Sequence, residues 1–220
     1  MEIKPIAIFR SPVSGKFGLP RQAGLVGGLR GRIVLEPEFR SPDALRGLDG
    51  FDYVWLIWEF NLNHGGDGRK MTVRPPRLGG NERVGVFASR SPFRPNPLGL
   101  SSVRVESIDF EKCEITVLGA DLADGTPIYD IKPYVTYSDC HEDARSGFVD
   151  GREWKRLKVV FPDGPSPLTE DGAEALSGIL AEDPRPQYHS DPDKVYGMTF
   201  EGYEVKFRVR GEILEVISIE

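Results

Sequence analysis

Glycine and proline divide this sequence into short segments, and this punctuation limits which folds the chain can adopt. The 220 residues include 25 Gly and 18 Pro. Both residues interrupt helices and mark turns, so the segments between them favour short strands over long helices. Strands and helices do not alternate regularly along the chain, which argues against a doubly wound α/β sheet. The sequence therefore predicts a mainly β fold, either a barrel or a sandwich.

Seven segments rich in β-branched, aromatic and aliphatic residues are expected to be strands. One of them, 53–58, is a continuous apolar run, which is typical of a strand buried on both faces. A short helix is expected to begin at Ser41, with Pro42 in its first turn. The expected strands are 3–9, 32–35, 53–58, 83–88, 101–108, 114–118 and 126–131.

The chain changes character after about residue 150. Residues 169–181 have apolar side chains at helical spacing, and Thr169 is placed to cap that helix. Three further segments, 194–200, 203–210 and 213–219, are separated by turns and predict a β-meander. We therefore expect two domains, a larger one at 1–150 and a small α+β domain at 151–220.

Composition and the absence of targeting segments predict a cytoplasmic protein. Hydrophobic residues make up 39% of the chain, which is enough for a core. No apolar run approaches the roughly 20 residues that cross a bilayer, and the first residues lack the apolar stretch of a signal peptide. Two cysteines, Cys113 and Cys140, do not form a disulfide framework. With His141 they lack zinc-site spacing, so no metal is expected.

Charge is distributed unevenly along the chain. The net charge is -6, yet residues 69–104 hold eight Arg or Lys and one acid, whereas residues 105–150 hold eleven acids and three bases. A local basic segment can contact a phosphate backbone even when the whole chain is acidic. The alternative is a solvated surface whose acids lie nearby in space.

Two Gly/Pro loops carry arginines that suit an anionic or polar ligand. The loop at 17–25 is either a plain connector or a segment in which Arg21 and Gln22 grip a carboxylate or a base edge. The loop at 72–81 holds Arg74 and Arg77 on either side of two prolines. It is either a rigid turn or a pre-organised pair of guanidinium groups.

Two later loops add further polar groups. The loop at 87–100 combines Arg90 and Arg94 with three prolines, and this composition favours a ligand-binding role. In the segment at 123–134, Asp130 and Lys132 share one face of an expected strand. They form either a surface ion pair or part of a polar cleft. The phosphate-binding, dinucleotide-binding and nucleophile-elbow motifs are absent from the sequence.

These four loops together resemble the TsaA-like (TrmO) family, whose bacterial members include tRNA methyltransferases. The resemblance covers roughly residues 3–140, and the tail is similar to the family's C-terminal extension through DPRPQY at 183–188. The motifs, in chain order, are PRQ at 20–22, TVRPPRLGGN at 72–81, RSPFRPNPLG at 90–99, and DGTP with DIKPY between 124 and 134.

The resemblance implies a fold, an activity and an assembly. It implies a small, non-Rossmann β-barrel at 1–150 that binds S-adenosylmethionine, and a homodimer. It also implies methylation of N6 of threonylcarbamoyladenosine at position 37 of tRNA, next to the anticodon (t6A to m6t6A). The protein would then be a tRNA (adenine(37)-N6)-methyltransferase whose partner is the anticodon loop.

The same resemblance assigns cofactor contacts to ten positions in the loops. The stretch around Asn61 and Leu62 departs from the His-Gln of some bacterial members, which leaves its side-chain contacts open. Leu62, Leu100 and Ile128 would form the apolar slot for adenine. The ten positions are Arg21, Gln22, Asn61, Leu62, Arg90, Leu100, Gly125, Thr126, Pro127 and Ile128.

The reaction and the RNA suggest roles for other residues. The accepting nitrogen lies beside a carbonyl and is poorly nucleophilic, so a base should help, and Asp124 and Asp130 are the candidates. The Pro-Arg-Pro segment around Arg185 should be exposed and stiff, serving either the mouth of the active site or a simple link. The predicted contacts to RNA or to the threonyl carboxylate are Arg74, Arg77, Arg94, Lys132, Arg185 and Tyr188.

Two other classes of function remain open from the sequence. A non-enzymatic RNA-binding barrel would share the basic loops without binding the cofactor. A hydrolase using Asp124 and Asp130 as a carboxylate pair is a more distant alternative.

Overall fold

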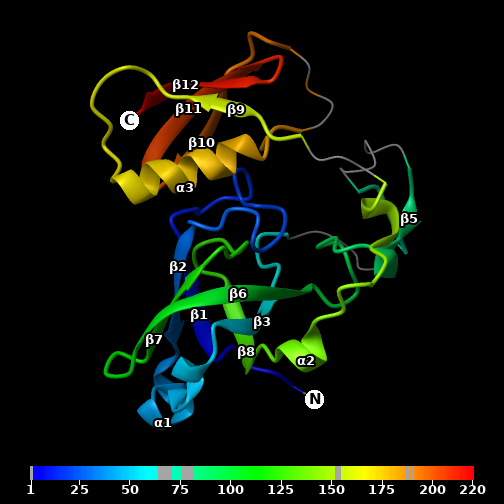
Figure 1. Cartoon of the computed structure of the whole chain (residues 1–220), viewed down its shortest axis with the longest axis vertical. Helices are drawn as coiled ribbons and strands as arrows, with labels where there is room; N and C mark the ends of the chain where they lie inside the picture. Colours follow the sequence, from blue (N-terminus) through cyan, green and yellow to red (C-terminus); the bar gives the residue numbers. More distant parts are fainter. Residues whose placement is uncertain (1, 64–70, 76–81, 152–154, 187–188, 190) are drawn as a thin grey trace.

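A closed, six-stranded antiparallel barrel forms the larger part of the molecule (Figure 1). The computed structural model describes residues 2–63, 71–75, 82–151, 155–186, 189 and 191–220. The expectation of a mainly β fold built on a small barrel is confirmed. In order around the barrel the strands are β1 (Ala7–Arg10), β2 (Arg30–Leu35), β7 (Glu114–Leu118), β6 (Leu98–Asp109), β3 (Tyr53–Glu59) and β8 (Pro127–Pro133).

The central strand β3 shows how the barrel is packed. Val54, Leu56 and Trp58 point into the barrel and are at most 5% exposed, whereas Tyr53 on the other face is 44% exposed. The prediction that this strand is buried on both faces was wrong. A closed barrel has one covered side, its interior, so its strands alternate between buried and partly exposed residues.

Short elements connect the barrel strands. Helix α1 (Pro42–Leu45) begins as expected, with the Ser41 hydroxyl accepting a hydrogen bond from the Asp43 N–H. Segment 83–88, expected as one strand, is instead the two-residue β5 (Val84–Gly85), which pairs with β4 (Thr72–Val73), followed by a 3-10 turn at Val86–Ala88. The remaining short helices are α2 (Thr136–Asp139) and 3-10 turns at Pro37–Phe39, Leu48–Gly50 and Gly147–Val149.

The C-terminal residues form a four-stranded sheet covered by one helix. Helix α3 (Glu170–Ala181) begins as predicted, because the Thr169 hydroxyl accepts a hydrogen bond from the Gly172 N–H at 3.1 Å. The predicted meander is present as β10 (Tyr196–Phe200), β11 (Tyr203–Arg210) and β12 (Ile213–Ile219). A fourth strand, β9 (Lys158–Val160), was not predicted and runs parallel to β12. Within the described residues, no helix has the length and apolar character needed to cross a membrane.

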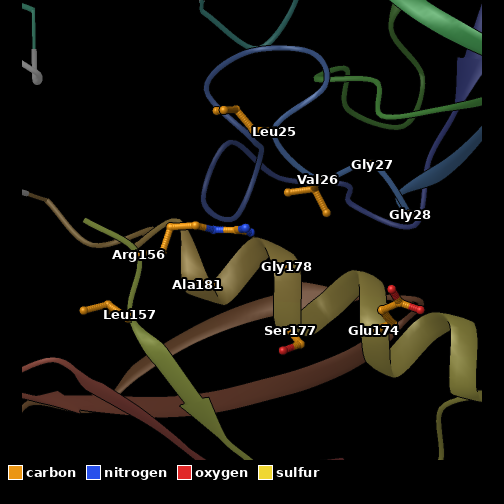
Figure 2. Close-up of a pocket in the computed structure, with 10 residues that line it drawn as sticks. All are labelled: Leu25, Val26, Gly27, Gly28, Arg156, Leu157, Glu174, Ser177, Gly178 and Ala181. Atoms are coloured by element: carbon orange, nitrogen blue, oxygen red, sulfur yellow. The ribbon is translucent and has the colours of Figure 1, made fainter. Parts of the chain in front are cut away.

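The loop between β1 and β2, residues 11–29, joins the barrel to the C-terminal sheet. Val13, Val26 and Leu29 from this loop are buried in one hydrophobic core with α3 and strands β10, β11 and β12. A groove of about 640 Å³ lies between the loop and α3, with 25–28 on one side and the helix on the other (Figure 2). The loop is therefore held from the C-terminal side as well as from the barrel.

Candidate functional site

Parts of three sequence motifs lie at the end of the barrel that faces the C-terminal sheet. Antiparallel strands place alternate connections at the same end of a barrel, and here these connections are residues 11–29, 60–97 and 119–126. The motif segments at 20–22, 90–97 and 124–126 therefore lie in connections at this rim, whereas β8 (127–133) leads away from it.

Gln22 and Arg90 meet at this rim although they are 68 residues apart in the chain. The Arg90 guanidinium donates a hydrogen bond from Nη1 to Gln22 Oε1 at 2.5 Å. Arg90 is exposed and Gln22 is half-buried, so the pair borders solvent. The structure thus brings together two residues that the sequence assigned to cofactor binding.

Asn61 and Thr126 form a second contact between predicted site residues. The Thr126 hydroxyl lies 3.3 Å from Asn61 Oδ1, and Thr126 is 1% exposed. The neighbouring Gly125 N–H donates to the Phe9 carbonyl at 2.8 Å, which fixes the turn to β1. Position 125 has a φ of +77°, a conformation that glycine adopts without a steric penalty.

A carboxylate that the sequence motifs did not single out lies beside these residues. Asp121 Oδ1 accepts a hydrogen bond from the Ser101 hydroxyl at 2.6 Å, and the Ser101 oxygen accepts one from the Trp58 indole N–H at 2.9 Å. Burial raises the pKa of Asp121, opposed by the Ser101 hydroxyl, the Ala23 N–H and the charge of Arg90. In the sequence, Asp121 could have been noticed only as a lone acid between apolar residues shortly after an expected strand.

The predicted apolar slot is not formed as expected. Leu100 is 59% exposed and pairs with Ile57 on the outer face of the barrel. Ile128 is fully buried in the barrel interior. Alternate strand residues face opposite sides, so these two side chains cannot line one slot. The Ile128 carbonyl accepts the Ile6 N–H within the barrel wall, and residues 125 and 126 before it lie in the connection at the rim.

The two candidate bases, Asp124 and Asp130, form their contacts with residues other than the predicted cofactor-binding ones. Asp124 accepts the Ser11 N–H at 3.1 Å and lies 3.7 Å from the Arg10 guanidinium. Asp130 forms a 2.8 Å ion pair with Lys132, as one of the two interpretations of that segment expected. In the described residues, no three His, Cys, Asp or Glu side chains cluster closely enough to hold a metal ion.

The predicted RNA-contacting cations differ in how they are held. Arg74 is exposed after β4, and Arg94 donates to the carbonyls of Ser89 and Ser91, stiffening its own loop. Arg77 and Tyr188 lie outside the described residues.

The expectation that Arg185 is exposed was wrong. Its side chain is 14% exposed and forms a two-pronged ion pair with Asp183, with hydrogen bonds of 2.8 and 2.9 Å. Arg21 in turn donates to the Asp183 carbonyl at 3.4 Å. A buried guanidinium needs such a partner, and proximity along the chain supplies it.

Comparisons with known proteins agree with this arrangement of loops. The N-terminal domain model of tRNA-methyltransferase O matches residues 8–140, and the C-terminal domain model of the same family matches residues 167–220. This chain belongs to the tRNA-methyltransferase O family. The family resemblance noted from the sequence motifs is thereby confirmed, and it extends into the C-terminal part.

Relatives and solved structures match over the full chain. The tRNA (adenine(37)-N6)-methyltransferase of Escherichia coli is 36% identical, covering 100% of this chain and 97% of that protein. A putative S-adenosylmethionine-dependent methyltransferase of Pseudomonas aeruginosa is 38% identical, covering 99% and 96%. A crystal structure of TrmO superimposes with a TM-score of 0.80 at 31% identity, covering 100% of this chain and 98% of that chain.

Proposed function

We propose that this chain transfers a methyl group from S-adenosylmethionine to N6 of threonylcarbamoyladenosine at position 37 of tRNA (t6A to m6t6A). The observation that carries the proposal is the match of both tRNA-methyltransferase O domains, in order, on one chain. The full-length similarity to the Escherichia coli tRNA (adenine(37)-N6)-methyltransferase supports the same activity.

The barrel rim has groups that suit this cofactor. The amino-acid end of S-adenosylmethionine carries a carboxylate, which a guanidinium such as that of Arg90 can bind through several N–H donors. Gln22, Asn61 and Thr126 add donors and acceptors for polar edges. Because Leu100 and Ile128 do not share a face, we expect the contribution of residues 125–128 to come from their backbone.

S-adenosylmethionine supplies an electrophilic methyl group on its sulfonium. Transfer forms the N6–carbon bond as the sulfur–carbon bond breaks, and the N6 proton leaves to a base. Asp124 and Asp130 are the proposed acceptors of this proton. Holding the two reactants in line supplies much of the rate in such a displacement.

The partners follow from the same proposal. The tRNA anticodon loop would lie along the basic residues of 69–104, with Arg74 and Arg94 among the described ones. We also propose a homodimer, supported by the exposure of Met71, Phe87 and Phe93 on neighbouring segments, at 52%, 75% and 52%. A tRNA substrate supports our further proposal that the protein acts in the cytoplasm.

Calorimetry with S-adenosylmethionine tests the proposal and separates it from a non-enzymatic RNA-binding barrel. We expect binding at micromolar level, about -8 kcal/mol. Arg90→Ala should weaken it about tenfold, because a hydrogen bond to a charged group is lost. No heat of binding with the unaltered protein would favour the RNA-binding barrel, and unchanged affinity of Arg90→Ala would remove Arg90 from the site.

A further inference from the structure

The part of the first loop that precedes Gln22 packs on the C-terminal sheet. The Phe17 ring stacks on Tyr196 of β10, with the ring centroids 6.4 Å apart. Gly18 lies so close to Met198 that a Cβ atom at Gly18 would come within 2.3 Å of the methionine side chain. The chain therefore approaches the barrel rim from a fixed position on the C-terminal half.

Arg21 adds a polar contact to this attachment, directly before Gln22. Its Nη2 atom donates a hydrogen bond to the Asp183 carbonyl at 3.4 Å, and its Nη1 atom is buried. The next side chain, Gln22, accepts a hydrogen bond from Arg90 at the rim. Two neighbouring residues thus face different halves of the molecule, and Arg21 links the C-terminal half to the Gln22–Arg90 pair.

The turn that presents the Asp183 carbonyl is built around an ion pair. Asp183 has a φ of +49° and follows the end of α3, where a left-handed residue is commonly glycine. An aspartate at this position brings a side chain that glycine lacks. The carboxylate accepts the Arg185 backbone N–H at 3.3 Å and both prongs of the Arg185 guanidinium at 2.8 and 2.9 Å. These bonds fix the turn whose carbonyl faces Arg21.

The helix end itself is closed by the backbone. The Asp183 N–H donates to the Leu180 carbonyl at 3.1 Å. The side chains of Arg185 and Asp183 are only 14% and 19% exposed, so their pairing carries a desolvation cost. Buried ion pairs of this kind add little net stability and can instead specify one arrangement of the chain. The arrangement specified here is the one that contacts Arg21.

We propose that Asp183 and Arg185 are positioning residues for cofactor binding, because their ion pair holds the Asp183 carbonyl against Arg21 and so sets the place of Gln22 at the rim. The inference rests on the proposed use of S-adenosylmethionine. It gives the C-terminal half a part in cofactor binding that is exerted through the contact with Arg21.

Hydrogen exchange of the full-length protein without cofactor tests the contact. The Gly24 N–H donates to the Gly119 carbonyl at 2.8 Å, so its exchange rate reports opening of the first loop. Arg185→Gln removes the charge and the two-pronged pairing. We expect exchange at Gly24 to become about tenfold faster, with the amides of β3 unchanged. A rate within about twofold of the unaltered protein would overturn the proposal, and so would an equal rise in β3.

Arg21→Gln completes a double-mutant cycle. If the ion pair acts through Arg21, both substitutions interrupt the same series of contacts. The double variant should then exchange at Gly24 no faster than the more affected single variant. Effects that multiply in the double variant would show that Arg185 acts by another route, which would overturn the proposal.

Asp183→Asn provides another variant should Arg185→Gln fail to fold. Asparagine tolerates the left-handed conformation and keeps one oxygen for Arg185, but it lacks the charge. We expect a smaller rise in exchange at Gly24, about threefold. An unchanged rate in this variant would contradict the proposal.

Calorimetry and steady-state kinetics connect the contact to the cofactor. In Arg185→Gln, the dissociation constant and the KM for S-adenosylmethionine should rise about tenfold, with kcat at saturating S-adenosylmethionine unchanged. Arg208→Gln is the matched control, since it breaks a 2.8 Å ion pair with Glu215 on the face of the C-terminal sheet that α3 does not cover. This control should change neither affinity nor exchange at Gly24.

The outcomes separate the contact from the proposed function. Faster exchange at Gly24 with unchanged affinity would overturn a role in cofactor binding, and so would an equal loss of affinity in Arg208→Gln. A failure of the unaltered protein to bind S-adenosylmethionine would contradict the proposed function. The exchange rates, which need no cofactor, would still decide whether the ion pair holds the first loop.

Discussion

At the scale of single residues, the environment of the Asp121 carboxylate opposes its charge. Burial raises its pKa above the ordinary value of 3.8. Because the pKa of Asp121 is higher in the folded protein, its protonated form is favoured by folding. This contribution to stability is complete below the ordinary pKa and is lost as the pH rises through the pKa of the folded protein. Asp121→Asn removes the ionisation, so we expect the free energy of unfolding at pH 7 to rise, as measured by urea unfolding.

Asp109→Asn is the matched control with the opposite sign. The Lys112 backbone N–H and side chain hold the pKa of Asp109 below its ordinary value. Its contribution to stability is therefore present above the ordinary pKa and lost as the pH falls through the folded value. The Asp109 variant should be less stable than the unaltered protein at pH 7. A stability loss at pH 7 in the Asp121 variant would refute the account of that residue.

Sequence motifs identified two residues that the fold brings into contact. Gln22 and Arg90 stand in recognisable motifs, and the barrel brings them into contact. Asp121 stands outside them, and its hydrogen-bond partner Ser101, which in turn accepts from Trp58, is distant in the chain. Arg185 was expected to be exposed because prolines flank it, yet its ion pair with Asp183 depends on a local turn. Proline composition does not reveal such a partner.

At the scale of elements, α3 packs closely on the first loop, which carries Gln22. A Cβ atom at Gly178 would lie 2.8 Å from Val26 Cγ1, and Val26 is buried and β-branched (Figure 2). Gly→Ala inside a helix normally stabilises by about 1 kcal/mol. Here we expect Gly178→Ala to destabilise by about 1–2 kcal/mol and to weaken S-adenosylmethionine binding, because the loop must move. Thermal unfolding and calorimetry measure the two effects.

Gly27→Ala is the control on the loop side of the same groove. No atom lies within 4 Å of the position that its Cβ would occupy, so affinity and stability should change little. Stabilisation of the Gly178 variant by the usual helix increment, with unchanged binding, would show that the loop tolerates displacement.

The sequence predicted helices and strands correctly where the periodic pattern of apolar residues extended over a long enough segment. The helix at 169–181 and the meander were predicted with small errors at their ends, since α3, β11 and β12 have clear periodicity and turns. Strand β9 has three residues and gains its partner β12 from more than 50 positions away, so local pattern could not reveal it. Segment 83–88 has strand-like residues, but β4 pairs with only two of them.

At the scale of the whole molecule, an acidic protein is proposed to bind an anionic RNA through one basic segment. Arg74→Glu combined with Arg77→Glu should weaken tRNA binding and flatten its dependence on salt, because each phosphate contact releases a counterion. Filter binding over a range of salt concentrations measures this slope. Lys4→Glu with Arg46→Glu makes the same charge change outside 69–104 and should leave the slope nearly unchanged. Equal slopes in the three proteins would place RNA binding elsewhere.

The two halves of the molecule share a core through the first loop, which the sequence did not indicate. The expected division near residue 151 followed composition and remains a proposal. Val13 and Leu29 are 0% and 2% exposed within the core that α3 and the C-terminal sheet complete. The loop that carries Arg21 and Gln22 therefore depends on both halves, and we expect the full chain to be needed for cofactor binding.

Methyl transfer to defined tRNAs is the decisive test of the proposed methylation of threonylcarbamoyladenosine at position 37. Labelled S-adenosylmethionine would be incubated with the full-length protein and with tRNA that carries, or lacks, the threonylcarbamoyl group on the adenosine at position 37. We expect label on N6 of the modified nucleoside, and little on the unmodified tRNA, because guanidinium groups at the rim would pair with the threonyl carboxylate. Equal labelling of both tRNAs would contradict the substrate assignment, and no labelling of either would contradict the proposed reaction.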